Sequence, residues 1–249
     1  AIDRDSLVPA VYETERFKSL PANVETGTGG PLDPAKLVQW HNMLPAGFPG
    51  QSIDPKSDPN GTGKYIKYDL TAAKALLSSA GFANGFDVEY HYTNTFSSAL
   101  TLEAELVIQM LGKLGLKVKP VLEDSATFQR GTFSGNFNGL GHMLQGFTEH
   151  VEFLTALYNT KGGRNQSRVE DPEITKDVVA IEQELDTNKR FAMTKAIQPN
   201  LAEKMWYVPT VAWQIRWDVT APKLRNIYDF QTYRGGNATV ERANLWFDP

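Results

Sequence analysis

One stretch of the sequence, residues 64–86, combines the start and end signals of a helix with a following strand. Asp69 suits the N-cap position, because its carboxylate can accept hydrogen bonds from unpaired N–H groups of the first helical turn. Gly81 suits the left-handed position that ends many helices. Between them, apolar residues recur at helical spacing: Ala73, Leu76, Leu77 and Ala80. The alternating segment 86–90 then predicts a strand, so the chain should adopt an α/β fold whose other elements cover this unit.

Periodicity predicts several further elements before residue 145. A short amphipathic helix near the N-terminus contains Ile2, Leu7, Val8 and Val11, with Pro9 inside it. A helix over 98–114 carries its apolar stripe on Leu102, Leu106, Met110 and Leu114, with Val107 and Leu111 beside them. Pro120 cannot donate a ladder hydrogen bond, so the strand at 117–121 should lie at a sheet edge or contain a bulge. A short helix over 125–132 should bury Phe128, and a small buried strand should follow within 133–144.

The C-terminal half predicts two capped helices and an aromatic strand. Asp171, Pro172 and Glu173 form a helix start, because they supply a cap, a residue with fixed φ and an acid near the positive helix end. The apolar stripe of this helix is Ile174, Val178, Ile181 and Leu185. Asp186 should cap the next helix and pair with Arg190, and residues 206–213 should form a strand.

Composition excludes several classes of protein. The chain has 249 residues, a net charge of -4 and no cysteine, which excludes thiol catalysis, disulfides and thiolate metal sites. The net negative charge gives no reason to expect a nucleic-acid partner. No apolar run approaches the roughly 20 residues that span a bilayer.

Catalytic and cofactor motifs are weak, so no cofactor and no metal site is expected. The four histidines do not form an HExxH motif. A loop-built hydrolase or metal site from His41, His142 and His150 stays open as an alternative. Residues 54–63 look like a calcium loop, but Lys56 occupies the first ligand position, which predicts a polar turn instead.

Several segments together resemble the peptide-type (family 5) extracellular solute-binding proteins of bacterial ABC importers. Residues 1–5 read AIDRD and are similar to the family's AIDR-[DE] segment, and residues 67–82 are similar to its YDPEKAKALLAEAGY segment. Asn84-Gly85-Phe86 matches the family's NGF turn, and residues 114–118 resemble its GI-x-V step. The segments at 171–174, 186–190 and 207–209 follow in the family's order.

The resemblance implies a type II periplasmic-binding-protein lobe, an α/β unit with a mixed sheet flanked by helices. In the family, an N-terminal lobe precedes the AIDR segment and the last residues of the chain return to it. We therefore expect residues 1–217 to form the C-terminal ligand-binding lobe of a two-lobed protein. Residues 218–249 should form a tail that packs on the missing N-terminal lobe.

The resemblance also implies where a ligand binds. The family's ligand loop typically reads W-x-A-D-Y, and the matching positions here are Met143, Leu144, Gln145, Gly146 and Phe147. In oligopeptide-binding members the Asp pairs with the α-ammonium group of the ligand, which Gly146 cannot do. A sugar, a glycoside or a modified peptide is therefore a credible ligand beside a free peptide. Trp213 matches an aromatic position of the family's pocket, and Trp40 and His41 lie in a loop that can approach the cleft.

The function implied by the resemblance is binding and not catalysis. The protein would capture a small solute or peptide and deliver it to an ABC permease at a bacterial membrane, from a periplasmic or extracellular position. A lipid anchor on the missing N-terminus would be compatible with this role. Besides the histidine enzyme, a structural fragment that binds another protein through Trp246 and Phe247 remains a further alternative.

Overall fold

The computed structural model describes residues 1–11, 38–39, 41–45, 48, 50–147, 149–210, 212–213, 224–225 and 246–247, and for the four dipeptides among them only the backbone. Its elements in chain order are α1 (Arg4–Val11), β1 (Val38–Gln39), α3 (Leu70–Ser79), β2 (Asp87–Thr93), α4 (Ser98–Leu114), β3 (Lys117–Glu123), α5 (Ser125–Arg130), the short 3-10 helix η2 (Thr132–Ser134), β4 (Leu140–Gly141), α6 (His150–Tyr158), α7 (Pro172–Gln183), α8 (Thr187–Lys204), β5 (Ala212–Trp213), β6 (Leu224–Arg225) and β7 (Trp246–Phe247). None of the helices in these ranges is long and apolar enough to cross a membrane.

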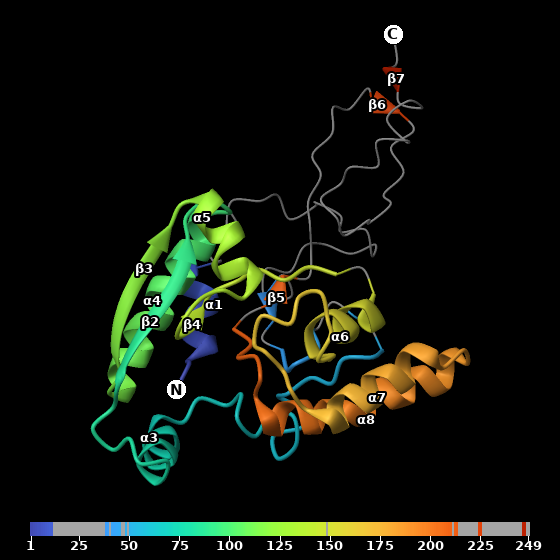
Figure 1. The fold of residues 1–249 in the computed structure, drawn as a ribbon, viewed down its shortest axis with the longest axis horizontal. Helices are drawn as coiled ribbons and strands as arrows, with labels where there is room; N and C mark the ends of the chain where they lie inside the picture. Colours follow the sequence, from blue (N-terminus) through green and yellow to red (C-terminus); the bar gives the residue numbers. More distant parts are fainter. Residues whose placement is uncertain are drawn as a thin grey trace.

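A parallel sheet with strand order β3-β2-β4 forms the first structural group, with α1, α4 and α5 beside it (Figure 1). Pro120 lies in β3 opposite Tyr90 of the central strand, so the prediction that this strand occupies a sheet edge is confirmed. Tyr90 and Tyr92 point to one face, where they pack with Leu7 of α1 and Val107 of α4. Burial on this face fixes the register of the sheet, because a shift by one residue would expose both tyrosines.

The helix over 98–114 is confirmed, and its buried face matches the predicted stripe in part. Val107 is buried, and Leu106, Met110 and Leu111 pack partly buried against the same core. Leu102 is 40% exposed, whereas Leu100, Glu103 and Ala104 are also buried. Both sets recur at helical spacing, so periodicity alone could not choose between them. Small Ala104 lies where α1 and the sheet meet α4, and close packing there determines the buried face.

The helix and strand between residues 69 and 93 are confirmed, but the expected burial of the helix is wrong. Asp69 caps α3 by accepting from the N–H of Ala72 at 2.8 Å, and Gly81 takes a left-handed φ of 90° just beyond the helix. None of the α3 residues is buried, and Leu76 is 55% exposed. In Figure 1, α3 lies at the end of the sheet away from α5, and it contacts α4. Strong local signals form this helix although its contacts leave none of its residues buried.

The second structural group is a helical core formed by α6, α7 and α8 with the segment 41–66, at the lower right of Figure 1. Ile174, Val178 and Ile181 of α7 are buried as predicted, whereas Leu185 lies beyond the helix and is 90% exposed. Asp186 caps α8 as expected. Arg190 does not confirm the predicted pair with Asp186; its guanidinium donates instead to the backbone carbonyl of Glu184 at 3.3 Å.

The side chain of Gln198 in α8 forms hydrogen bonds with the segment 41–53. Its amide nitrogen donates to the carbonyls of Gln51 and Thr194 at 2.7 and 2.9 Å. Its amide oxygen accepts from Asn42 Nδ2 and from the backbone N–H of Ile53 at 3.0 and 2.9 Å. The side chain is fully buried and bonds at both ends, so it satisfies polar groups of this segment, whose described residues form no helix or strand. The predicted polar turn at 54–63 is also present, with Asp58 accepting from Thr62.

Arg4 joins the two groups. This residue lies in α1, is 5% exposed, and donates through Nη1 to the carbonyl of Ile66 at 2.6 Å and through Nε to that of Pro209 at 2.8 Å. Nη2 of Arg4 also donates to the carbonyl of Pro209. Residues 206–210 do not form the predicted strand, and among the described residues of 206–213 only Ala212–Trp213 (β5) is a strand. Pro209 has no N–H to donate to a strand ladder, and its carbonyl accepts from Arg4.

Two short antiparallel ladders involve the C-terminal part of the chain. β1 pairs with β5, which places the backbone of Trp213 opposite Val38. β6 pairs with β7 between residues 224 and 247. Apart from these two strands, the predicted tail at 218–249 lies outside the described residues, so the division at residue 217 stays a prediction.

We expect replacement of Arg4 to destabilise the whole fold. Arg4→Met removes the donor that satisfies buried carbonyls of Ile66 and Pro209, which should lower the free energy of unfolding by about 3 kcal/mol or more. Equilibrium denaturation with urea measures this change. Lys56→Gln is the matched control, since Lys56 and its partner Asp5 are 54% and 72% exposed and their pair should contribute less than about 1 kcal/mol. Equal effects of the two substitutions would contradict the proposed role of Arg4.

Candidate functional site

The candidate site lies at the carboxyl ends of the parallel strands. The segments that leave these ends are 94–97 after β2, 124–134 after β3 and 142–147 after β4. In open α/β sheets, ligands bind outside the carboxyl ends of the strands, because the loops there diverge and leave space between them. The predicted ligand loop, residues 143–147, is therefore at the edge where this architecture places a ligand.

Hydrogen bonds at both sides hold this loop in position. The N–H of His142 donates to the carbonyl of His91 at 2.8 Å and extends the pairing of β4 with β2. Gln145 Nε2 donates to Gln166 Oε1 at 3.3 Å, and Gln166 Nε2 donates to the carbonyl of Phe133 at 3.1 Å. Between these anchors Leu144 is 47% exposed. The loop thus presents one apolar side chain to solvent from a fixed backbone.

Gln145 keeps an unpaired acceptor. Its Oε1 is buried and has no hydrogen-bond partner among the residues that the structure describes. A buried acceptor without a donor costs free energy, so such groups need a specific explanation. This amide is a candidate contact for a donor group of a ligand.

Aromatic rings and one arginine pack behind the loop. Phe147 is buried and meets the Phe153 ring edge-on, with the ring centroids 5.3 Å apart. The guanidinium carbon of Arg164 lies 5.1 Å from the Phe147 ring centroid and 5.6 Å from that of Phe133. Cations are attracted to the negative face of aromatic rings, so this arrangement fixes where the arginine sits.

A buried polar network lies below the start of the loop. The hydroxyl of Tyr90 is 2.9 Å from His142 Nδ1, and His142 Nε2 is 3.9 Å from the carboxylate of buried Glu103. Burial lowers the pKa of His142, although the Glu103 carboxylate opposes this shift. Burial also raises the pKa of Tyr90, so its hydroxyl stays protonated near pH 7 and shares a hydrogen bond with Nδ1. The lowered pKa of His142 favours the neutral imidazole near pH 7.

The other predicted site residues are only partly described. Trp213 is in β5 and its backbone pairs with β1, which ends two residues before His41. His41 is half-buried, and its Nδ1 lies 2.7 Å from the carbonyl of Asn42. The side chain of Trp213 and the whole of Trp40 lie outside the described residues. Their part in a ligand site stays a prediction.

The histidines of the alternative enzyme lie in different surroundings. His142 belongs to the network with Tyr90, whereas His150 packs between the rings of Phe48 and Phe191 at 6.4 and 5.4 Å. Within the described ranges, no group of three or more His, Asp or Glu side chains could hold a metal ion.

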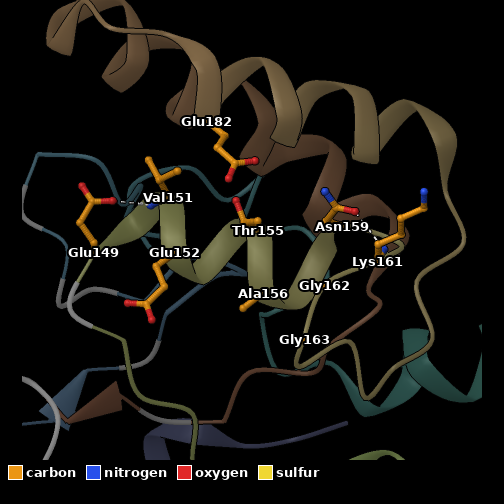
Figure 2. A pocket seen from close by; sticks show the side chains of 10 residues that line it. All are labelled: Glu149, Val151, Glu152, Thr155, Ala156, Asn159, Lys161, Gly162, Gly163 and Glu182. Atoms are coloured by element: carbon orange, nitrogen blue, oxygen red, sulfur yellow. Dashed lines mark hydrogen bonds between the residues drawn. The ribbon is translucent and has the colours of Figure 1, made fainter.

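A groove of about 470 Å³ lies elsewhere, along α6 and the segment that follows it (Figure 2). Its lining residues are Glu149, Val151, Glu152, Thr155, Ala156, Asn159, Lys161, Gly162, Gly163 and Glu182. None of the predicted ligand-loop residues is among them. The predicted ligand loop therefore does not line this groove.

Comparison with known proteins establishes the family. A family model described as "Bacterial extracellular solute-binding proteins, family 5 Middle" matches residues 1–165. The chain therefore belongs to the family 5 extracellular solute-binding proteins. No curated protein matches the chain.

Solved structures share the fold of this family 5 chain. HbpA2 from Haemophilus parasuis has a TM-score of 0.62 and 21% identity, over 84% of this chain and 37% of its own. The ABC transporter-associated periplasmic binding protein DppA from Helicobacter pylori, in complex with the peptide STSA, has a TM-score of 0.60 and 17% identity, over 90% of this chain and 39% of its own. AgaA from A. tumefaciens, in complex with agropinic acid, has a TM-score of 0.60 and 16% identity, over 99% of this chain and 47% of its own. The chain thus spans less than half the length of each of these type II periplasmic binding proteins.

Sequence reasoning missed two side chains that contact the candidate loop and its neighbours. Arg164 and Gln166 lie in the segment 159–171 between α6 and α7, which has no apolar periodicity. Their contacts with Phe133, Gln145 and Phe147 join parts of the chain that are distant in sequence. The only signal available was the polar, turn-rich composition of the segment, which predicts a loop and nothing about its neighbours.

We expect His142 to make the stability of this family 5 chain depend on pH. Because burial lowers the folded-state pKa of His142, the unfolded chain binds the proton more tightly. Stability is then complete above the unfolded pKa of about 6.5 and is lost as pH falls from there to the folded pKa.

His142→Asn tests this expectation, since an amide oxygen can still accept from Tyr90 but does not titrate. The slope of unfolding free energy against pH below about 6.5 should decrease by at most about 1.4 kcal/mol per pH unit. Urea unfolding across this pH range measures the slope. An unchanged slope in the variant would show that His142 is not the group responsible.

Proposed function

We propose that this chain forms the C-terminal lobe of the solute-binding component of an ABC importer. Its family and its type II binding-protein fold support this role. In this proposal residues 1–217 supply one wall of a cleft, and residues 218–249 return to a second lobe. Closure of the two lobes buries a solute, and the closed form delivers it to a membrane permease. The corresponding location is the periplasm or the cell exterior.

The observation that carries the proposal is the position of the loop 143–147. It lies at the carboxyl edge of the parallel sheet, its backbone is anchored through His142 and Gln145, and Leu144 is half exposed. An exposed apolar side chain on a fixed backbone suits a surface that becomes buried against a ligand. We assign solute contact to Met143, Leu144, Gln145, Gly146 and Phe147, with Trp213, Trp40 and His41 as further candidates.

The chemistry of the loop supports a solute without a free amino terminus. Gly146 stands where oligopeptide-binding members carry the Asp that pairs with the ligand's α-ammonium group, and residues 143–147 contain no acidic side chain. Two proteins of similar fold bind different solutes, a peptide in one case and agropinic acid in the other. The fold therefore leaves the ligand open, and the loop favours a modified peptide, a sugar or a glycoside.

Substitution of Leu144 tests the position of the site. In the protein that contains both lobes, Leu144→Ala should weaken binding of the tightest solute from a peptide and sugar panel by about 5- to 10-fold, because burial of the removed methyl groups is lost. Isothermal titration calorimetry measures the affinity. Leu185→Ala is the matched control, because Leu185 is 90% exposed at the end of α7 and should not affect binding. Equal affinities of the two variants would place the site elsewhere.

Substitution of Gly146 tests the expected ligand class. Gly146→Asp restores a carboxylate at the position that pairs with an α-ammonium group in oligopeptide-binding members. We expect the ratio of affinities for a free peptide and its N-acetylated form to rise by about 10-fold, as for one charge-assisted hydrogen bond. Gln145→Glu adds the same charge one residue away and serves as the control. If the unmodified protein already preferred the free peptide strongly, the assignment of a blocked ligand would be wrong.

A further inference from the structure

Two buried histidines flank the candidate loop 143–147. His142 comes directly before the loop, and His150 follows its last residue by three positions. Their side chains are only 9% and 3% exposed. The N–H of His142 donates the bond to His91 that anchors the start of the loop. At the other end, edge contacts link four rings whose successive centroids are 5.3, 6.0 and 6.4 Å apart: Phe147, Phe153, Phe48 and His150. A charge on either imidazole would therefore act on one end of the loop.

The surroundings of His142 favour its neutral form. Its Nδ1 lies 2.9 Å from the hydroxyl of Tyr90 in β2, and its Nε2 lies 3.9 Å from the carboxylate of Glu103 in α4. The positive charge of Arg4 in α1 interacts with the same carboxylate, which offsets the attraction that Glu103 offers to an imidazolium. Burial therefore prevails and lowers the pKa of His142, although Glu103 opposes the shift.

His150 is likewise surrounded by groups that disfavour a charge. It packs against the rings of Phe48 and Phe191, and its Nδ1 faces the carboxylate of Glu149 at 3.4 Å. The Glu149 side chain is 51% exposed, so water screens its charge. Nε2 is buried and has no hydrogen-bond partner in the part of the chain that the structure describes, so an imidazolium would bury an N–H without an acceptor. Burial lowers the pKa of His150, and nearby Arg190 of α8 adds to this shift against the opposing effect of Glu149.

We propose that His142 and His150 act as a pH-sensitive lock on the loop 143–147, which is closed while both imidazoles are neutral and opens when they are protonated. Opening exposes both rings to water, where an imidazole has its ordinary pKa of about 6.5 and binds a proton more readily than in the closed form. The open form therefore gains population as pH falls below about 6.5. Between about pH 7.5 and about pH 5.5, its population should rise by up to about 10-fold per histidine and about 100-fold for the two together.

Opening of the loop concerns the fold alone, whereas its consequence for transport rests on the proposed function. If residues 143–147 contact the solute, acid would loosen one wall of the cleft and favour release, because protons bind more tightly to the open form. Solute release would then depend on the acidity of the surrounding medium. Opening is measurable without any solute, so failure of the lock and failure of the proposed function can be told apart.

Hydrogen exchange of the loop amides, measured by mass spectrometry, tests the lock in the protein that contains both lobes. After correction for the intrinsic pH dependence of exchange, the protection of residues 143–147 should fall by about 10- to 100-fold between about pH 7.5 and about pH 5.5. His142→Asn and His150→Gln each remove one titrating ring. Each variant should therefore show a smaller fall, of at most about 10-fold, and the double variant should show none. Helix α3 contains no histidine and serves as the internal reference.

His91→Gln is the matched control and should keep the full change. Its side chain pairs with Glu123 at 2.7 Å, and the substitution retains the backbone carbonyl that accepts from His142. NMR titration of the unmodified protein with isotope-labelled histidine covers the case that a variant does not fold, and both rings should then titrate below about 6.5. Unchanged protection of the loop, an equal fall in α3 or in the double variant, or titration of either ring above about 6.5 overturns the inference.

Discussion

The buried guanidinium of Arg4 is the interaction on which the arrangement of this chain depends. Ile2 and Leu7, beside it in sequence, belong to the core under the sheet, whereas Ile66 belongs to the core of α6, α7 and α8. Arg4 bonds the carbonyls of Ile66 and Pro209 and so connects both cores through one side chain. Burial lowers its pKa to about 10, so it remains charged near pH 7. A buried charge is tolerated only where hydrogen bonds satisfy it, and here backbone carbonyls do so.

The residues that follow α8 connect Arg4 to the candidate site. Pro209 is held by Arg4, and two residues earlier the hydroxyl of Tyr207 bonds the carbonyls of Leu157 and Arg164. The segment that carries Arg164 is therefore fixed relative to α6 and, through Pro209, relative to α1. The loop 143–147 is anchored to the sheet that α1 also supports. The loop and the segment that carries Arg164 thus share one frame, and Phe147 of the loop itself belongs to the core of α6, α7 and α8.

The sequence predicted what local signals determine and failed where distant contacts decide. The caps at Asp69, Asp171 and Asp186 were predicted correctly, because a cap needs only its own first helical turn. The buried face of α4 was predicted only in part, because packing against α1 and the sheet buries Leu100 and Ala104 and leaves Leu102 exposed. The strand expected at 206–213 was mostly wrong: residues 206–210 form no strand, and the carbonyl of Pro209 accepts from Arg4, about 200 residues away in the chain. The family resemblance located the loop 143–147, but no pattern could place Arg164 next to it.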